Sequence, residues 1–140
     1  MEPLLRPRPV PGAVSLGLLL LRVVAGVALV LHSFSKLEEP TGWLPGSPFP
    51  GWALAIGAYA ELIGGTLFVL GLVTPLAGLL VAGVMAGAVY YHVNAGHPFV
   101  GSPPSFELAL VYGLIGVVVL LAGPGDMAVD RALFREKGGG

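Results

Sequence analysis

Four apolar segments, separated by stretches rich in proline, glycine and polar residues, dominate the pattern of the chain. A helix needs about 20 mostly apolar residues to cross the hydrocarbon core of a bilayer. Each segment is close to that length and contains few charges, so we expect four transmembrane helices in an all-α, integral membrane four-helix bundle. The expected spans are residues 14–34, 52–72, 75–93 and 105–122.

The connections between these segments indicate which helices are neighbours. Residues 36–51 contain four prolines and three glycines, and residues 94–104 are also rich in breakers, so both stretches are expected to be loops. Between the second and third spans, Gly71 suits the end of one helix and Pro75 the first turn of the next. We therefore expect a tight antiparallel hairpin there, within a single domain over residues 1–140 that has polar tails at 1–13 and 131–140.

The distribution of positive charges predicts the orientation in the membrane. Basic residues flank the first and last spans at Arg6, Arg8, Arg131, Arg135 and Lys137, whereas the loops at the opposite end contain only Lys36. By the positive-inside rule, both termini are expected to be cytoplasmic and the protein to lie in the plasma membrane. The loops over 36–51 and 94–104 would then face outward.

Composition supports membrane insertion and narrows the chemistry. Hydrophobic residues make up 55% of the chain and charged residues only 11%, whereas soluble domains contain about 25% charged residues. The net charge of -1 gives no indication of nucleic-acid binding. Because the chain has no cysteine, thiolate-held iron–sulfur clusters and disulfide exchange are excluded, and a redox role would need a non-covalent cofactor or a partner.

Two charged residues deep inside the spans are expected to form a structural ion pair. A charge at the bilayer centre costs about 2.5–3.5 kcal/mol on insertion scales, so it tends to face the bundle interior and to have a partner. Arg22 and Glu61 lie at similar depths on consecutive antiparallel spans. Gly57, Gly64 and Gly65 surround Glu61 on one helix face, where small residues favour close helix packing and also allow homo-oligomers.

A second polar group lies nearer the expected outer side. His32 and Lys36 fall on nearly the same face as Arg22, while His92 ends the third span and Glu107 begins the fourth. We interpret His32, Lys36, His92 and Glu107 as a candidate catalytic cluster, with no metal site expected. The alternatives are that the first three anchor the helices at the interface and that Glu107 complements a helix dipole.

Residues across all four spans resemble the DoxX family of small membrane proteins in their order and spacing. The matching stretches run from Leu16 to Asp130. They contain Arg22, His32, Lys36, Glu61 with Gly64-Gly65, the turn Gly71-x-x-Thr74, Glu107, and Gly123-Pro124-Gly125 with Asp130. The chain departs from the family at Ser33, where glycine is common, and at Pro75, where arginine is frequent.

The resemblance implies a four-helix membrane protein, often with a redox role. Related DoxD-type proteins are associated with thiosulfate:quinone oxidoreductase, so the first hypothesis is a quinone-linked subunit that acts with a soluble or membrane-bound partner. Other members resemble membrane anchors for soluble redox partners, which makes a non-catalytic scaffold the second hypothesis. The third is a small transporter, with Arg22 and Glu61 on the path.

A quinone site would need an apolar slot open to lipid and hydrogen-bond partners for the ring carbonyls. Tyr112, His32 and His92 are the candidate quinone-binding residues. The two histidines also lie at similar depths, which would suit a b-type haem. We disfavour the haem, because lone histidines are common at membrane interfaces.

Overall fold

The computed structural model describes residues 11–135, excluding the side chains of residues 134 and 135. Within this range the secondary structure is helical, and the all-α four-helix architecture expected from the sequence is confirmed. The charges at Arg6, Arg8 and Lys137, and the side chain of Arg135, lie outside the described residues. The helices are α2 (Gly12–Leu37), α3 (Gly51–Leu70), α4 (Thr74–Asn94), α5 (Glu107–Ala122) and α6 (Val129–Arg135).

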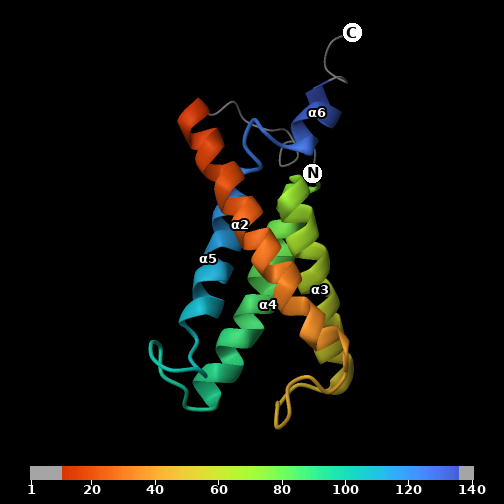
Figure 1. The fold of residues 1–140 in the computed structure, drawn as a ribbon, viewed down its shortest axis with the longest axis vertical. Helices are drawn as coiled ribbons and strands as arrows, with labels where there is room; N and C mark the ends of the chain where they lie inside the picture. The colour runs from red at the N-terminus through yellow and green to blue at the C-terminus, as the bar shows by residue number, and fades with distance from the viewer. Residues whose placement is uncertain (1–10, 136–140) are drawn as a thin grey trace.

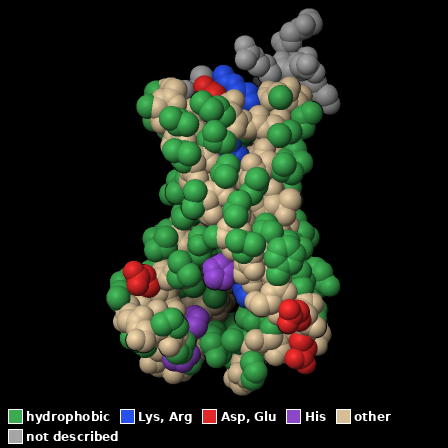
Figure 2. Space-filling model, viewed as in Figure 1, with side chains coloured by type: hydrophobic (Ala, Val, Ile, Leu, Met, Phe, Trp, Pro, Cys, Tyr) green, Lys and Arg blue, Asp and Glu red, His purple; other side chains and the backbone are tan. Residues whose placement is uncertain are grey.

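The four long helices correspond one to one with the expected spans. Three of them, α2, α3 and α4, are long and apolar enough to cross a membrane, while α5 is apolar but has only 16 residues. Large hydrophobic side chains point outward along the bundle, among them Leu20, Ile63 and Leu114. Figure 2 shows that the middle of the visible face is almost free of charged side chains, as expected for a surface covered by lipid.

The helices pack as a bundle whose two ends differ. α2 contacts α3 and α5, and α4 contacts α3 and α5. The loops over 38–50 and 95–106 lie at one end, which we call the loop end (Figure 1). The α3–α4 turn, the start of α2 and α6 lie at the other end, the α6 end. Toward the loop end, α2 and α5 diverge, and so do α3 and α4.

The hairpin expected at residues 71–75 is present and is fixed by a distant carboxylate. Gly71 ends α3 in the left-handed region with φ +65, and its N–H donates to Leu67 O at 2.8 Å. Asp130 then caps α4: its carboxylate accepts bonds from Val73 N at 2.7 Å and Thr74 N at 2.8 Å. Thr74 Oγ1 donates to the same carboxylate at 2.7 Å, which satisfies donors that a helix start leaves free.

The segment after α5 is more ordered than a polar tail. We expected residues 131–140 to be a tail, but residues 129–135 form α6. The backbone N–H of Asp130 donates to Gly71 O at 3.0 Å, and its side chain is buried against the hairpin. These bonds hold the start of α6 against the α3–α4 turn, so α6 belongs to the packed part of the molecule.

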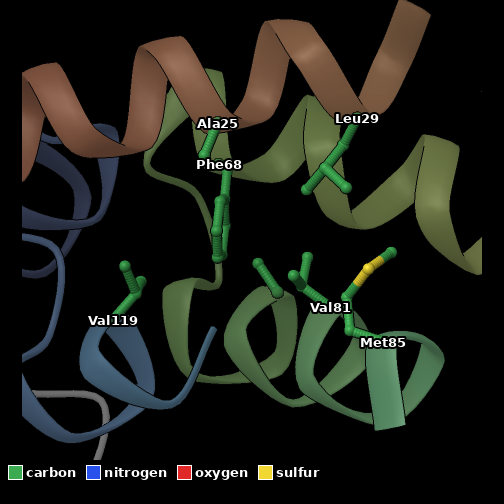
Figure 3. Packing of buried hydrophobic residues seen from close by; sticks show 7 residues of the cluster. Ala25, Leu29, Phe68, Val81, Met85 and Val119 are labelled. Carbon is green, nitrogen blue, oxygen red and sulfur yellow. The ribbon is translucent and has the colours of Figure 1, made fainter. Parts of the chain in front are cut away.

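A small apolar core joins the helices near mid-bundle. Figure 3 shows Phe68 pointing from α3 toward α4, with Leu29, Val81 and Val119 around it. Each of these four side chains is at most 1% exposed. Because they come from four different helices, this core fixes the relative positions of α2, α3, α4 and α5.

Glycines allow the helices to cross closely beside this core. A Cβ at Gly26 would lie 2.6 Å from Gly65 O, and a Cβ at Gly78 would lie 2.7 Å from Gly116 O. Both distances are too short for a real side chain. The α2–α3 and α4–α5 crossings therefore depend on glycine, which lets two helix backbones approach each other.

Candidate functional site

A cavity of about 520 Å³ lies between the four long helices at the loop end. Its walls are mostly apolar, and the loop after α2 covers it with Trp43, Leu44 and Phe49. Figure 2 shows a hollow at this end of the molecule, with His and Lys or Arg side chains around it. The volume lies within the range of about 300–1,000 Å³ that is typical of small-molecule sites.

An ion pair between Lys36 and Glu61 forms part of the cavity wall. The side chain of Glu61 is 2% exposed and that of Lys36 is 21% exposed. Lys36 lies in the last turn of α2, from which the ammonium group at the end of its long side chain reaches Glu61 on α3. The pair places a positive and a negative charge beside an apolar space.

We expected Arg22 to pair with Glu61, but Glu61 pairs with Lys36 instead. Arg22 is fully buried, and its side chain bonds to groups toward the α6 end. Its Nη1 donates to Phe68 O at 3.0 Å and its Nη2 to Met127 O at 2.8 Å. The guanidinium group therefore satisfies carbonyl groups at the end of α3 and in the segment before α6, while Glu61 is closer to Lys36.

Trp43 connects the covering loop to the ion pair, which the sequence analysis did not anticipate. The Lys36 ammonium lies 4.7 Å from the centre of the Trp43 ring, a cation–π arrangement. The indole Nε1 of Trp43 donates to Leu54 O on α3 at 3.0 Å. The position of Trp43 over Lys36 depends on how the loop folds back, which the residue pattern does not determine.

His32 on α2 and Tyr112 on α5 face each other where these two helices move apart. Their ring centres are 6.4 Å apart in an edge-on arrangement, and both residues line the cavity. His32 is exposed and Tyr112 is half-buried. The two side chains thus lie where the cavity borders the surface of the bundle, between α2 and α5.

His92 lines the cavity from α4 and is held by a loop residue. Its Nδ1 lies 2.8 Å from Nδ1 of His97, and the His97 backbone N–H donates to His92 O at 3.0 Å. The ring of Tyr91 packs edge-on against both histidines. One imidazole must donate and the other accept, so this contact orients His92 beside the cavity.

The structure brings together only part of the expected polar cluster. His32, Lys36, His92 and Tyr112 all line the cavity, and Glu61 joins them. Glu107 is exposed in the first turn of α5 and is not part of the cavity wall. Its position suits the favourable interaction of a carboxylate with a helix start. Within residues 11–135, apart from the undescribed side chains, no group of three or more His, Asp or Glu residues converges to hold a metal.

The glycines near Glu61 differ in what surrounds them. A Cβ at Gly64 would meet Val81 Cγ2 at 3.0 Å, and a Cβ at Gly65 would meet Gly26 O at 2.9 Å, so both lie in helix contacts. We expected the same of Gly57, but a Cβ there would meet nothing within 4 Å. Gly57 lies in the first half of α3, which starts at the loop end, and it lines the cavity.

Comparison with known proteins identifies the family of this bundle. The DoxX family model matches residues 17–94, which include α3 and α4 and most of α2. The chain belongs to the DoxX family. Together with the long apolar helices, this membership makes it a multi-pass membrane protein.

Two bacterial relatives match this DoxX-family protein over most of their length. A protein of Bacillus subtilis (strain 168) named "Putative oxidoreductase CatD" is 34% identical over 128 residues, covering 89% of this chain and 92% of that protein. An uncharacterized protein of Haemophilus influenzae is 32% identical over 120 residues, covering 83% of this chain and 90% of that protein. No solved structure matches the chain.

Proposed function

We propose that this DoxX-family protein is the quinone-binding membrane subunit of an oxidoreductase, with a partner protein that oxidises the electron donor. The observation that carries the proposal is the cavity of about 520 Å³, with apolar walls and the Lys36–Glu61 pair in one of them. The name of the Bacillus relative supports an oxidoreductase role. The proposal assigns the protein to the plasma membrane, with the loop end facing outward.

The residues in the cavity fit a quinone head. A quinone ring is flat and apolar, with carbonyl oxygens that accept hydrogen bonds. The ammonium group of Lys36, the hydroxyl group of Tyr112 and the imidazole of His32 can each donate such a bond. The divergence of α2 and α5 beside His32 and Tyr112 would give the apolar chain of a quinone a way out into lipid.

A bound quinone would supply the redox chemistry by accepting two electrons and two protons. The residues of this chain would bind the ring and control proton access. Glu61 holds the Lys36 ammonium group at the cavity wall, so this hydrogen-bond donor is already oriented before a ligand binds. The imidazoles of His32 and His92 can each carry a proton on a ring nitrogen, and both side chains line the cavity. In this account, they bring protons to the cavity.

The proposal is tested by ligand binding to the purified protein. We expect a short-chain ubiquinone or menaquinone analogue to bind saturably in nanodiscs, as measured by calorimetry and by quenching of tryptophan fluorescence. The double variant Lys36→Met/Glu61→Gln should weaken binding at least tenfold, because about 1.5–3 kcal/mol is typical of a hydrogen bond to a charged group. Changing both partners avoids leaving one buried charge unpaired.

The chain provides a matched control for this double variant. Asp126 and Arg131 form a second ion pair at the α6 end, away from the cavity. Asp126→Asn/Arg131→Gln should leave quinone affinity unchanged. The absence of saturable binding to the wild-type protein would contradict the proposal. A partner protein that co-purified with a wild-type protein unable to bind quinone would support the scaffold hypothesis instead.

A further inference from the structure

The loop between α4 and α5 differs in character from the other loop at the loop end. Residues 95–106 contain no Lys, Arg, Asp or Glu, and the side chains of Phe99 and Val100 are 50% and 57% exposed. The α2–α3 loop instead begins with two exposed acids, Glu38 and Glu39. In Figure 1 the α4–α5 loop projects sideways from the bundle, whereas the α2–α3 loop extends along its long axis.

The backbone places Phe99 beside the helices rather than beyond their ends. A Cβ at Gly113 would lie 3.2 Å from Met85 Cβ, so these two residues face each other on α5 and α4. Counting six residues toward the loop end puts Glu107, the first residue of α5, level with Tyr91. Tyr91 lies three residues, about 4.5 Å, before the end of α4. The Glu107 N–H donates to Phe99 O at 3.0 Å, so Phe99 lies at this same level.

This level corresponds to the expected edge of the bilayer. Tyr90, next to Tyr91, is exposed, and so is Trp52 at the start of α3. Exposed Trp and Tyr side chains of membrane proteins favour the headgroup region. α5 has 16 residues, which span about 24 Å of a hydrocarbon core of about 30 Å. The fourth span is therefore too short to carry the chain clear of the membrane before the loop.

The loop backbone suits the headgroup region and not the hydrocarbon core. Pro98, Pro103 and Pro104 have no N–H to satisfy, and the Phe106 N–H donates to Pro98 O at 3.3 Å. The other polar groups of this non-helical segment need water, which the hydrocarbon core lacks. The rings of Phe99 and Phe106 pack with their centres 5.3 Å apart, which supports the orientation of Phe99.

We propose that Phe99 and Val100 form a lipid anchor, which inserts at the boundary between the headgroups and the acyl chains at the loop end. Burial in lipid removes two exposed apolar side chains from water. The uncharged loop adds no charge that would oppose insertion. Ser105, in the same loop, lines the cavity, so the anchor also fixes the depth of that wall. This inference goes beyond the proposed function and does not depend on which ligand the cavity binds.

Spin labelling of the full chain in phosphatidylcholine vesicles tests the anchor. The chain has no cysteine, so a nitroxide can be attached at Val100→Cys, with Thr41→Cys as the aqueous reference and Leu114→Cys as the lipid reference. Power saturation measures collisions with oxygen and with a water-soluble nickel chelate. We expect the oxygen-to-nickel ratio at Val100→Cys to exceed that at Thr41→Cys by at least about threefold, because oxygen partitions into the apolar phase and the polar chelate does not.

The two collision rates also identify the other surroundings that the loop could have. A ratio at Val100→Cys equal to that at Thr41→Cys would place the loop in water and overturn the inference. Low collision rates with both reagents would show that protein covers the loop, such as a second copy of this chain, and would also overturn it. Only frequent collisions with oxygen and rare collisions with nickel support a lipid anchor.

Substitutions at Phe99 test whether its apolar side chain holds the loop in the membrane. With the label at Val100→Cys, Phe99→Ser should at least double the nickel collision rate, because a hydroxymethyl group gains little from leaving water. Phe99→Leu is the matched control: it keeps an apolar side chain and should retain the wild-type rate. Unchanged nickel collisions in Phe99→Ser would overturn the anchoring role of Phe99, as would equal increases in both variants. The thermal unfolding midpoint of each variant confirms that the bundle is intact.

Discussion

At the scale of single residues, the charged groups of this protein serve two separate regions. Arg22 and Asp130 are buried at the α6 end and bond mainly to backbone groups of other segments. Lys36 and Glu61 pair with each other beside the cavity at the loop end. The first region holds the chain together, whereas the second is the one available to a ligand.

The role of Asp130 leads to a stability prediction. Asp130→Asn should lower the free energy of unfolding by about 2 kcal/mol, because an amide group replaces an acceptor oxygen and leaves buried donors at the start of α4 without a partner. Thermal or denaturant unfolding in detergent measures this loss. Asp126→Asn is the control: its pair with Arg131 is partly exposed, so we expect a change below about 1 kcal/mol. Similar losses for both variants would refute the capping role.

The sequence predicted which residues are buried and charged, but not how they pair. Arg22 and Glu61 stood out because charges are costly in lipid, and both are buried. The pairing depended on depths estimated from the ends of the spans. Those estimates could not include the long reach of Lys36 or the Met127 carbonyl group, which the segment before α6 brings near Arg22. The position of Trp43 over Lys36 was equally inaccessible, because it depends on the path of a proline-rich loop.

At the scale of the helices, close crossings and divergence explain why there is a cavity at all. Gly26 and Gly65 bring α2 and α3 into contact, and Gly78 and Gly116 do the same for α4 and α5. Beyond these crossings the helices diverge toward the loop end. The glycine motif around Glu61 was visible in the sequence, but the sequence could not show that Gly57 would lie beyond the crossing.

The crossings lead to a second stability prediction. Gly65→Ala should destabilise the protein by about 1–3 kcal/mol, because its methyl group would overlap the backbone of α2. Gly17→Ala makes the same chemical change at an open position and should be neutral or slightly stabilising. Unfolding curves of the two variants in the same detergent provide the measurement. A neutral Gly65→Ala would show that the crossing does not require glycine.

At the scale of the whole molecule, the orientation in the membrane stays a prediction. The chain has no cysteine, so single cysteines can be introduced without background labelling. Thr41→Cys, in the covering loop, should react with a membrane-impermeant maleimide in intact cells. Ala132→Cys, in α6, should react only after permeabilisation. Both positions are exposed, and the reverse labelling pattern would place the termini outside and contradict the positive-inside assignment.

The central claim is that a quinone binds inside the bundle, between the four helices, rather than on its lipid-facing surface. Photolabelling with an azido-quinone in vesicles, followed by peptide mapping, tests this claim most directly. We predict adducts on cavity residues such as Met85 and Tyr91, which excess unlabelled quinone should suppress. Adducts confined to outward-facing residues such as Leu20 and Leu70, and unaffected by unlabelled quinone, would contradict the account.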